Sequence, residues 1–253
     1  MESYSITTAN GLHELFLSLG NLMYFRGVTN SEFSLIPKIG RTSLYPKDVF
    51  NHLEGELDKS IFMASKREQV ILDEFKTRSL PFLDFKPDNE WEWLALAQHH
   101  GLPTRLMDWT TNPLVATYFA LKGWKNHDSD AAIYFLENND FVFAKVLPET
   151  EPYSLNTIRT YKPKHLNNRI VAQAGLFTVH DRPWISFEGD QLTQVIIPRE
   201  LMEDINRMLE IYGINDSTMF PGLDGISNHI INKRGLLDTI AATTKDANMA
   251  GQT

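Results

Sequence analysis

The sequence predicts an α+β fold in which a mixed, mostly antiparallel sheet is flanked by helices. Helix-forming segments dominate the first half of the chain, whereas most strand-like segments lie in the second half. Several short apolar runs end at Gly, Pro, Asn or Asp, which is typical of strands that lead into turns. With 253 residues, 42% of them apolar, the chain is long enough to bury a substantial core.

Helices are predicted where apolar residues recur every three or four positions. The first runs from Asn10, as its cap, to Gly20. The longest covers residues 46–79, either as one helix or as two that meet near Ala64. Another begins after the cap Asn112, with Pro113 at its first position, where proline is favoured. Further helices are predicted for residues 89–100, 200–212 and 224–232.

Strands are predicted for residues 22–26, 104–110, 169–180 and 192–198. Residues 131–136 and 141–146 have the pattern of a hairpin around Asn138-Asn139-Asp140. We expect residues 1–240 to form one domain, with a helical insertion at about residues 46–100. Residues 241–253 are small and polar, as in a flexible tail.

Composition excludes several classes of protein. The absence of cysteine excludes disulfides, cysteine-based zinc sites and thiol nucleophiles. The 32 acidic and 24 basic residues argue against long-range attraction to nucleic acid, but they allow a local basic cleft. Glycine-rich phosphate loops are missing. Because no signal peptide or membrane-spanning run is evident, we expect a cytoplasmic protein without a membrane partner.

Charged residues interrupt two apolar, strand-like segments, at Arg26 and at Arg105 and Asp108. A buried Arg or Asp is costly unless another group pairs with it. These residues therefore form either internal ion pairs or a site for a polar ligand. If Arg26 and Asp108 were a buried pair, loss of Arg26 would cost roughly 3–5 kcal/mol. Strand alternation places Arg105 on one face with Trp109, and Asp108 on the other with Thr110.

Arginine suits a ligand site because its planar guanidinium grips phosphate or carboxylate through two hydrogen bonds. Two embedded arginines beside Trp109 favour a ligand site over a purely structural pair. Gln173 and Gly175, which interrupt the strand predicted at residues 169–180, form the third candidate. Glycine in a strand lets a ligand approach, although a bulge with a solvent-facing amide fits these residues equally well.

Metal chemistry has weaker support, and no metal ligand is predicted. His99 and His100 are adjacent, about 100° apart around a helix, whereas metal-binding pairs prefer a spacing of four residues. Asp84-Phe85-Lys86 has the Asp-x-Lys pattern of metal nucleases, but such a short pattern often occurs by chance.

The motifs together resemble the FRG-domain family, named for its Phe-Arg-Gly signature, here Phe25-Arg26-Gly27. The matching blocks run in order from about residue 24 to residue 225, so they cover nearly the whole chain. Gly222 departs from the acidic residue expected at its position. The further blocks are residues 98–110 (QHHGLPTRLMDWT), 112–116 (NPLVA), 118–120 (YFA), 173–180 (QAGLFTVH) and 220–225 (FPGLDG).

The family's layout is similar to that of ADP-ribosyltransferases, which implies an ADP-ribosyltransferase-like core with NAD as the substrate. The resemblance implies catalytic roles for Arg26, Asp108 and Gln173. Gln173 takes a position often held by Glu, and because an amide is not a general base, Asp108 or a histidine near it would accept any proton. Alternatively, nicotinamide leaves through an oxocarbenium-like state, and Arg26 and Arg105 mainly bind the pyrophosphate and orient the ribose. The implied NAD-binding residues are Arg26, Gly27, Arg105, Trp109, Thr110 and Tyr118.

The resemblance also implies a toxin-like effector of bacterial phage defence. Such a protein would modify a nucleic acid, RNA being favoured, or a protein, and an antitoxin protein would restrain it. Two alternatives stay open at this point. One is a non-catalytic module that binds a nucleotide or an acidic partner segment, and the other is a metal-dependent nuclease.

Overall fold

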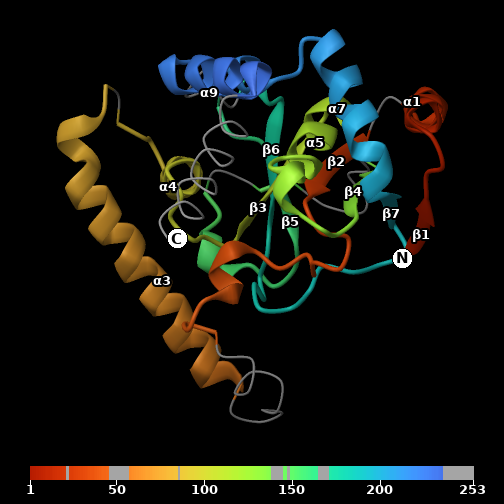
Figure 1. Cartoon of the computed structure of the whole chain (residues 1–253). Coiled ribbons are helices and arrows are strands. Elements are labelled where there is room, and N and C mark those ends of the chain that lie inside the picture. Colours follow the sequence, from red (N-terminus) through yellow and green to blue (C-terminus); the bar gives the residue numbers. More distant parts are fainter. Residues whose placement is uncertain are drawn as a thin grey trace, which may run out of the picture.

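A computed structural model describes residues 1–20, 23–45, 57–84, 86–137, 145–146, 149–164 and 171–235. It confirms the α+β prediction, since a seven-stranded mixed sheet is flanked by helices (Figure 1). The strand order is β1-β7-β4-β2-β3-β6-β5. The strands are β1 (Glu2–Ser5), β2 (Met23–Val28), β3 (Leu106–Thr110), β4 (Ala131–Glu137), β5 (Arg159–Tyr161), β6 (Gly175–Val179) and β7 (Leu192–Ile197).

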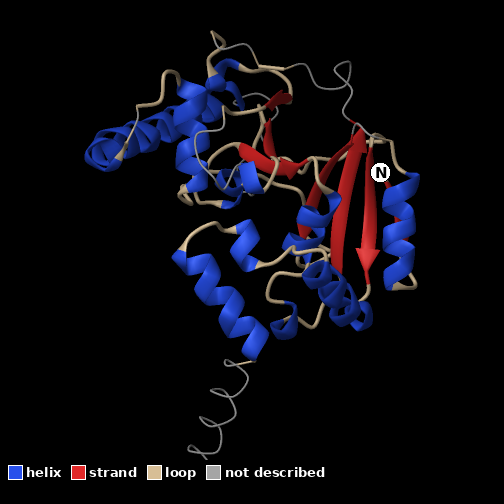
Figure 2. Cartoon of the chain, turned by 90° about the horizontal axis from the view of Figure 1, so that it is seen from above, coloured by secondary structure: helices blue, strands red, loops and turns tan. Residues whose placement is uncertain are grey.

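The sheet divides between β2 and β3. These two strands pair only at Phe25 and Thr110, whereas β2 and β4 are in register from Met23 to Val28. Figure 2 accordingly shows the strands in two groups, with the long strands side by side in one of them. Strands β1 and β7 pair in parallel, and the other neighbouring strands pair antiparallel. Where β2 and β3 move apart, the backbone of each strand is available to border a site between the two groups.

Three helices cover one face of the larger group β1-β7-β4-β2. They are α1 (Ala9–Ser18), α5 (Pro113–Ala120) and α7 (Met202–Ile211). Their core contacts explain the apolar periodicity of these segments, because each helix buries one stripe against the strands. The shared core contains Leu12, Phe25, Ala116, Ile133, Val195 and Ile205.

The smaller group β3-β6-β5 packs against α4 (Glu90–His99) and α3 (Leu57–Ser79), a long helix along one side of the molecule (Figure 1). The short helix α8 (Asp216–Met219) and the longer α9 (Leu223–Arg234) complete the described helices. The core under α4 contains Leu72, Trp91, Leu94, Leu106, Phe177 and Val179. Single 3-10 turns occupy Lys38–Arg41, Leu80–Phe82, Trp124–Asn126, Pro152–Ser154 and Arg199–Leu201.

The structure corrects several boundaries. Helix α1 begins at Ala9, and Thr8 rather than Asn10 caps it, since the Thr8 hydroxyl accepts a hydrogen bond from the Gly11 amide. The strand predicted at residues 169–180 is shorter, because β6 starts only at Gly175 and a turn precedes it. Strands β1 and β5 were not predicted.

The hairpin predicted for residues 131–136 and 141–146 lies only partly within the described residues. Strand β4 has β7 on one edge and β2 on the other. Lys145 forms an isolated bridge with Thr160, which belongs to β5. Predictions for residues 46–56, 138–144 and 241–253 lie outside the described residues. The assignment of residues 1–240 to one domain with an insertion at about residues 46–100 stays a prediction.

Candidate functional site

A cavity of about 470 Å³ opens where β2 and β3 diverge. We call it the Arg26 cavity. It brings together residues that are up to 152 positions apart in the sequence, from Phe25 to Phe177. Six of the predicted site residues line it, namely Arg26, Gly27, Asp108, Trp109, Thr110 and Gln173. Residues that were not predicted also line it, among them Phe33, Lys38, Arg41, Gln98 and Phe119.

The Phe-Arg-Gly signature gives each of its residues a different task. Phe25 belongs to the core under α5. A Cβ atom on Gly27 would lie 1.9 Å from the Ala116 carbonyl oxygen, so the lack of a side chain lets α5 lie directly on β2. Arg26 points to the opposite face, because successive strand residues alternate. The signature therefore fixes a helix against a strand while it places one cation beside the cavity.

Arg26 links the two strand groups through a hydrogen bond, but these groups do not supply an acceptor for every donor of its guanidinium. Its Nη1 atom donates a 2.7 Å hydrogen bond to the Asp108 carbonyl oxygen and lies 3.9 Å from the Asp108 carboxylate. The buried Nε atom has no hydrogen-bond partner within the described chain. Burial lowers the pKa of Arg26, an effect that Asp108 opposes and Arg41 reinforces. Burying a donor without a partner costs about 1–3 kcal/mol, so stability alone does not explain this arginine.

Asp108 is accessible and held in a fixed orientation. Its side chain is 62% exposed, and its Oδ2 atom accepts a 3.0 Å hydrogen bond from the Gln98 amide. The Thr104 hydroxyl in turn donates to Gln98 Oε1 at 2.8 Å. Water can hydrate this carboxylate, so the 3–5 kcal/mol expected for an unpaired buried Asp108 does not apply. Gln98 was missed as a site residue, although it opens the second sequence block.

Two further cations line the Arg26 cavity from the turn Lys38–Arg41, which the sequence showed only as a loop. Arg41 donates through Nε to the Ile36 carbonyl at 2.8 Å, and burial lowers its pKa. Lys38 donates to the Gly101 carbonyl at 2.7 Å. In the described lining, three Lys or Arg side chains thus accompany one carboxylate, Asp108. This excess of positive charge favours an anionic ligand.

Arg105 lies elsewhere and does not line the Arg26 cavity. It is 1% exposed, and its Nε and Nη2 atoms both bond the Glu68 carboxylate at 3.0 Å. Ser65 Oγ and the Pro152 carbonyl oxygen accept further, longer hydrogen bonds. Burial alone would lower the pKa of Arg105, but Glu68 raises it overall. Arg105 therefore ties the start of β3 to α3 and lies outside the Arg26 cavity, while its role in NAD binding stays a prediction.

Tyr118 also points away from the Arg26 cavity. It is buried, its hydroxyl donates to the Asp216 carboxylate, and its ring packs beside Phe220. The neighbouring Phe119 lines the cavity instead. One helical step turns a side chain by about 100°, so the aromatic residue at the site is the one that follows Tyr118. Tyr118 therefore does not line the Arg26 cavity, and its role in NAD binding stays a prediction.

Trp109 is positioned by a buried polar chain. Its indole Nε1 donates to the Thr178 Oγ1 atom at 2.9 Å. The Thr178 hydroxyl can then donate to Nε2 of His180, which lies 2.9 Å away. Burial, with contributions from Arg26 and Arg105, lowers the pKa of His180 to about 3. His180 is therefore neutral near pH 7 and accepts this hydrogen bond.

Gln173 lies in the turn before β6 rather than within a strand. Its backbone carbonyl accepts a 2.7 Å hydrogen bond from the Thr110 hydroxyl. Its side-chain amide donates to the Met219 carbonyl oxygen at 3.0 Å. These contacts hold Gln173 at the wall of the Arg26 cavity, which the bulge interpretation did not anticipate.

Among the described residues, no group of three His, Asp or Glu side chains could hold a metal ion. Asp84 and Lys86 are exposed, and neither lines the Arg26 cavity. None of the described helices combines the length and the apolar character that crossing a bilayer requires.

Comparison with known proteins gives one match. Residues 21–129 match the family model described as the FRG domain. No curated protein and no solved structure matches the chain. The matched region contains Arg26, Gln98, Asp108 and Phe119, while Gln173 lies beyond it. Residues 21–129 are therefore similar to the FRG domain, in agreement with the Phe25-Arg26-Gly27 signature, whereas the blocks at residues 173–180 and 220–225 lie outside the match.

Proposed function

We propose that the Arg26 cavity binds NAD and that the protein transfers ADP-ribose from NAD to a macromolecular acceptor. The observation that carries this proposal is the cluster of Arg26, Arg41 and Lys38 around an oriented, accessible carboxylate, Asp108. Arginine pairs are well suited to a pyrophosphate. The cavity volume of about 470 Å³ falls in the range of small-molecule sites.

In the proposed reaction, the acceptor displaces nicotinamide from the ribose of NAD. The bond between ribose C1′ and the nicotinamide nitrogen breaks, and nicotinamide leaves with the electron pair. An acceptor oxygen or nitrogen forms the new bond to C1′, and its proton passes to the Asp108 carboxylate. Arg26 and Arg41 hold the pyrophosphate, Phe119 packs against the nicotinamide, and Gln173 orients the ribose. Gly27, Trp109 and Thr110 complete the wall.

The rival function is a binding module that holds a nucleotide without turnover. Asp108 weakens the binding of a nearby phosphate in either function, but only the transferase has a use for it, as the proton acceptor. The Gln98 amide nevertheless holds this carboxylate in place, which suits a proton acceptor better than an anion site. A metal-dependent nuclease gains no support, since the described residues offer no metal ligand group.

The biological role that we propose rests on the family resemblance alone. It is that of a cytoplasmic toxin of phage defence, which modifies a nucleic acid, with RNA favoured, or a protein, and which an antitoxin restrains. Of this role, the class of macromolecule that accepts ADP-ribose is the easiest part to test by experiment.

Purified protein is incubated with NAD labelled in the adenosine part, in parallel with cell RNA, cell DNA and lysate protein. The proposal predicts nicotinamide release and labelling of one class of macromolecule, with both lost in Arg26→Gln. Lys233→Gln, on α9, removes an exposed charge that does not belong to the cavity lining and serves as the matched control. NAD binding without release supports the binding module, and chelator-sensitive cleavage of nucleic acid supports the nuclease.

A further inference from the structure

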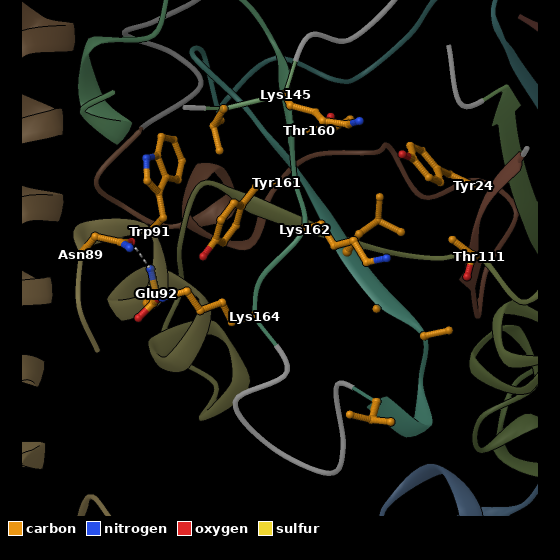
Figure 3. Close-up of a pocket in the computed structure, with 15 residues that line it drawn as sticks. Tyr24, Asn89, Trp91, Glu92, Thr111, Lys145, Thr160, Tyr161, Lys162 and Lys164 are labelled. Carbon is orange, nitrogen blue, oxygen red and sulfur yellow. Dashed lines mark hydrogen bonds and ion pairs between the residues drawn. The ribbon is translucent and has the colours of Figure 1, made fainter. Parts of the chain in front are cut away.

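A second cavity, of about 570 Å³, lies beside α4, β5 and the start of β6 (Figure 3). We call it the lysine cavity. Lys145, Lys162 and Lys164 line it, together with the aromatic residues Trp91 and Tyr161. Figure 3 shows Trp91 and Tyr161 on one side of the cavity and Tyr24 and Thr111 on the other. The lining thus combines cations with aromatic rings.

The lysine cavity is locally positive although the whole chain carries a net charge of -8. Three lysines and one carboxylate, Glu92, belong to its described lining. Lys164 is held by Glu92 at 2.9 Å and by Asp88 at 3.0 Å, so its charge is largely balanced. Lys162 is exposed, and Figure 3 shows its side chain extending across the cavity toward Thr111. Lys162 is therefore well placed to contact a bound anion.

The aromatic wall of the lysine cavity is rigid. Trp91 donates through its indole nitrogen to the Thr150 carbonyl at 2.7 Å, and its ring centroid lies 5.5 Å from that of Tyr161. Tyr161 in turn stacks with Phe177. Burial, together with Glu92, raises the pKa of Tyr161, so its phenol stays neutral beside an anion. Trp91 is 1% exposed, so of these two rings only the half-buried Tyr161 can contact a base. Grooves that combine accessible aromatic rings with lysines bind single-stranded nucleic acid.

The two cavities adjoin at the start of β6. Gly175 and Leu176 line both of them. Of the two preceding residues, Gln173 lines the Arg26 cavity and Ala174 lines the lysine cavity. Ala174 has a φ of 45°, in the left-handed region, and its carbonyl accepts a hydrogen bond from the Thr111 amide at 3.2 Å. At this turn, the neighbouring residues Gln173 and Ala174 therefore line different cavities.

We infer that the lysine cavity binds the phosphate backbone of a single-stranded nucleic acid, with Lys162 as a phosphate contact. The adjoining Arg26 cavity then faces the nucleotide that receives ADP-ribose. This inference deepens the proposed function and rests on it for the identity of the strand as the acceptor. The binding itself needs no NAD, so it can be measured separately from the transfer.

The test uses fluorescein-labelled 12-nucleotide RNA and DNA strands and the full chain without NAD. Fluorescence anisotropy gives Kd over a range of salt concentrations. We expect Lys162→Gln to weaken binding by about threefold to tenfold and to reduce the slope of log K against log salt by about 0.7. Lys233→Gln removes the same charge from exposed α9 and should bind as the wild type does.

Three results would overturn the inference. They are no binding of either strand at low salt, equal affinity of Lys162→Gln and wild type, and displacement of the strand by a poly-glutamate peptide of equal charge. The last result would identify an acidic peptide site instead. Nicotinamide release is measured in parallel. Release without strand binding rejects this inference and keeps the transferase, whereas strand binding through Lys162 without release keeps the site and rejects the transferase.

Discussion

Arg26 donates a 2.7 Å hydrogen bond to the backbone carbonyl of Asp108, at the point where two groups of strands separate. The same guanidinium lies 3.9 Å from the Asp108 carboxylate, which is 62% exposed. Arg105, only three residues before Asp108, is instead enclosed by Glu68. The two arginines that looked equivalent in the sequence therefore differ, and Arg26 is the one that can meet a ligand.

Glu68→Gln should lower the free energy of unfolding by about 3–5 kcal/mol, because it leaves the Arg105 charge buried and only partly paired. Urea denaturation measures this change. Glu74→Gln, on the same helix, removes half of an exposed ion pair with Arg78 and should cost less than about 1 kcal/mol. Equal effects of the two substitutions would contradict a structural role for the Glu68–Arg105 pair.

Gly27→Ala should destabilise the protein by about 1–3 kcal/mol, because the added methyl group overlaps the backbone of α5. The new Cβ would lie 1.9 Å from the Ala116 carbonyl oxygen and 2.5 Å from the Ala120 nitrogen. Gly20→Ala is the matched control, since its Cβ would have no neighbour within 4 Å. Thermal melting compares them, and an unchanged melting temperature for Gly27→Ala would contradict the close packing of α5 on β2.

His180 should make the protein less stable in acid. Its folded pKa of about 3 lies below the ordinary value of 6.5, so only the unfolded chain takes up the proton between these values. Its contribution to stability is complete above about pH 6.5 and is lost as the pH falls toward 3, by at most about 1.4 kcal/mol per pH unit.

Urea denaturation between pH 4 and pH 7 measures that pH dependence. His180→Gln should show a shallower loss of stability with acid than the wild type, whatever its stability at pH 7. His100→Gln, at an exposed position, should keep the wild-type slope. A wild-type slope in His180→Gln would mean that other groups cause the acid sensitivity.

Phe119→Ala should weaken NAD binding by about tenfold or more, since it removes an aromatic wall of the Arg26 cavity. Tyr118→Phe should cost about 1 kcal/mol of stability through the lost hydrogen bond to Asp216, with nicotinamide release kept. Calorimetric titration with NAD compares the two variants. The opposite ranking would restore Tyr118 to the site and reject this orientation of α5.

Much of the fold could be predicted because local signals were strong. Helix α5 begins where Asn112 accepts a hydrogen bond from the Leu114 amide and Pro113 follows, as its sequence indicated. Strand β1 carries no apolar pattern because all four of its residues are exposed at the sheet edge. The pairing of β4 with β2 and β7 could not be predicted locally, because it joins segments that are far apart in the sequence.

The site could be predicted only in part. Arg26 and Asp108 were predicted because each is a charged residue within an apolar segment, and the structure places both at one cavity. Glu68, the partner of Arg105, lies 37 residues earlier, on α3. This helix carries several acidic residues, and the sequence does not indicate which of their carboxylates is buried. Lys38 and Arg41 lie in a 3-10 turn whose position in the fold depends on tertiary contacts. The sequence around Lys38 and Arg41 therefore could not predict that both side chains line the same cavity as Arg26.

The central claim is that Arg26 serves a ligand rather than the fold. The most direct measurement is nicotinamide release from NAD by the wild type and by Arg26→Gln, with a thermal melt of each. We predict a loss of release of about a hundredfold or more, with a stability change of about 1 kcal/mol or less. Release at the wild-type rate by a folded Arg26→Gln protein would contradict the claim, as would a variant that fails to fold.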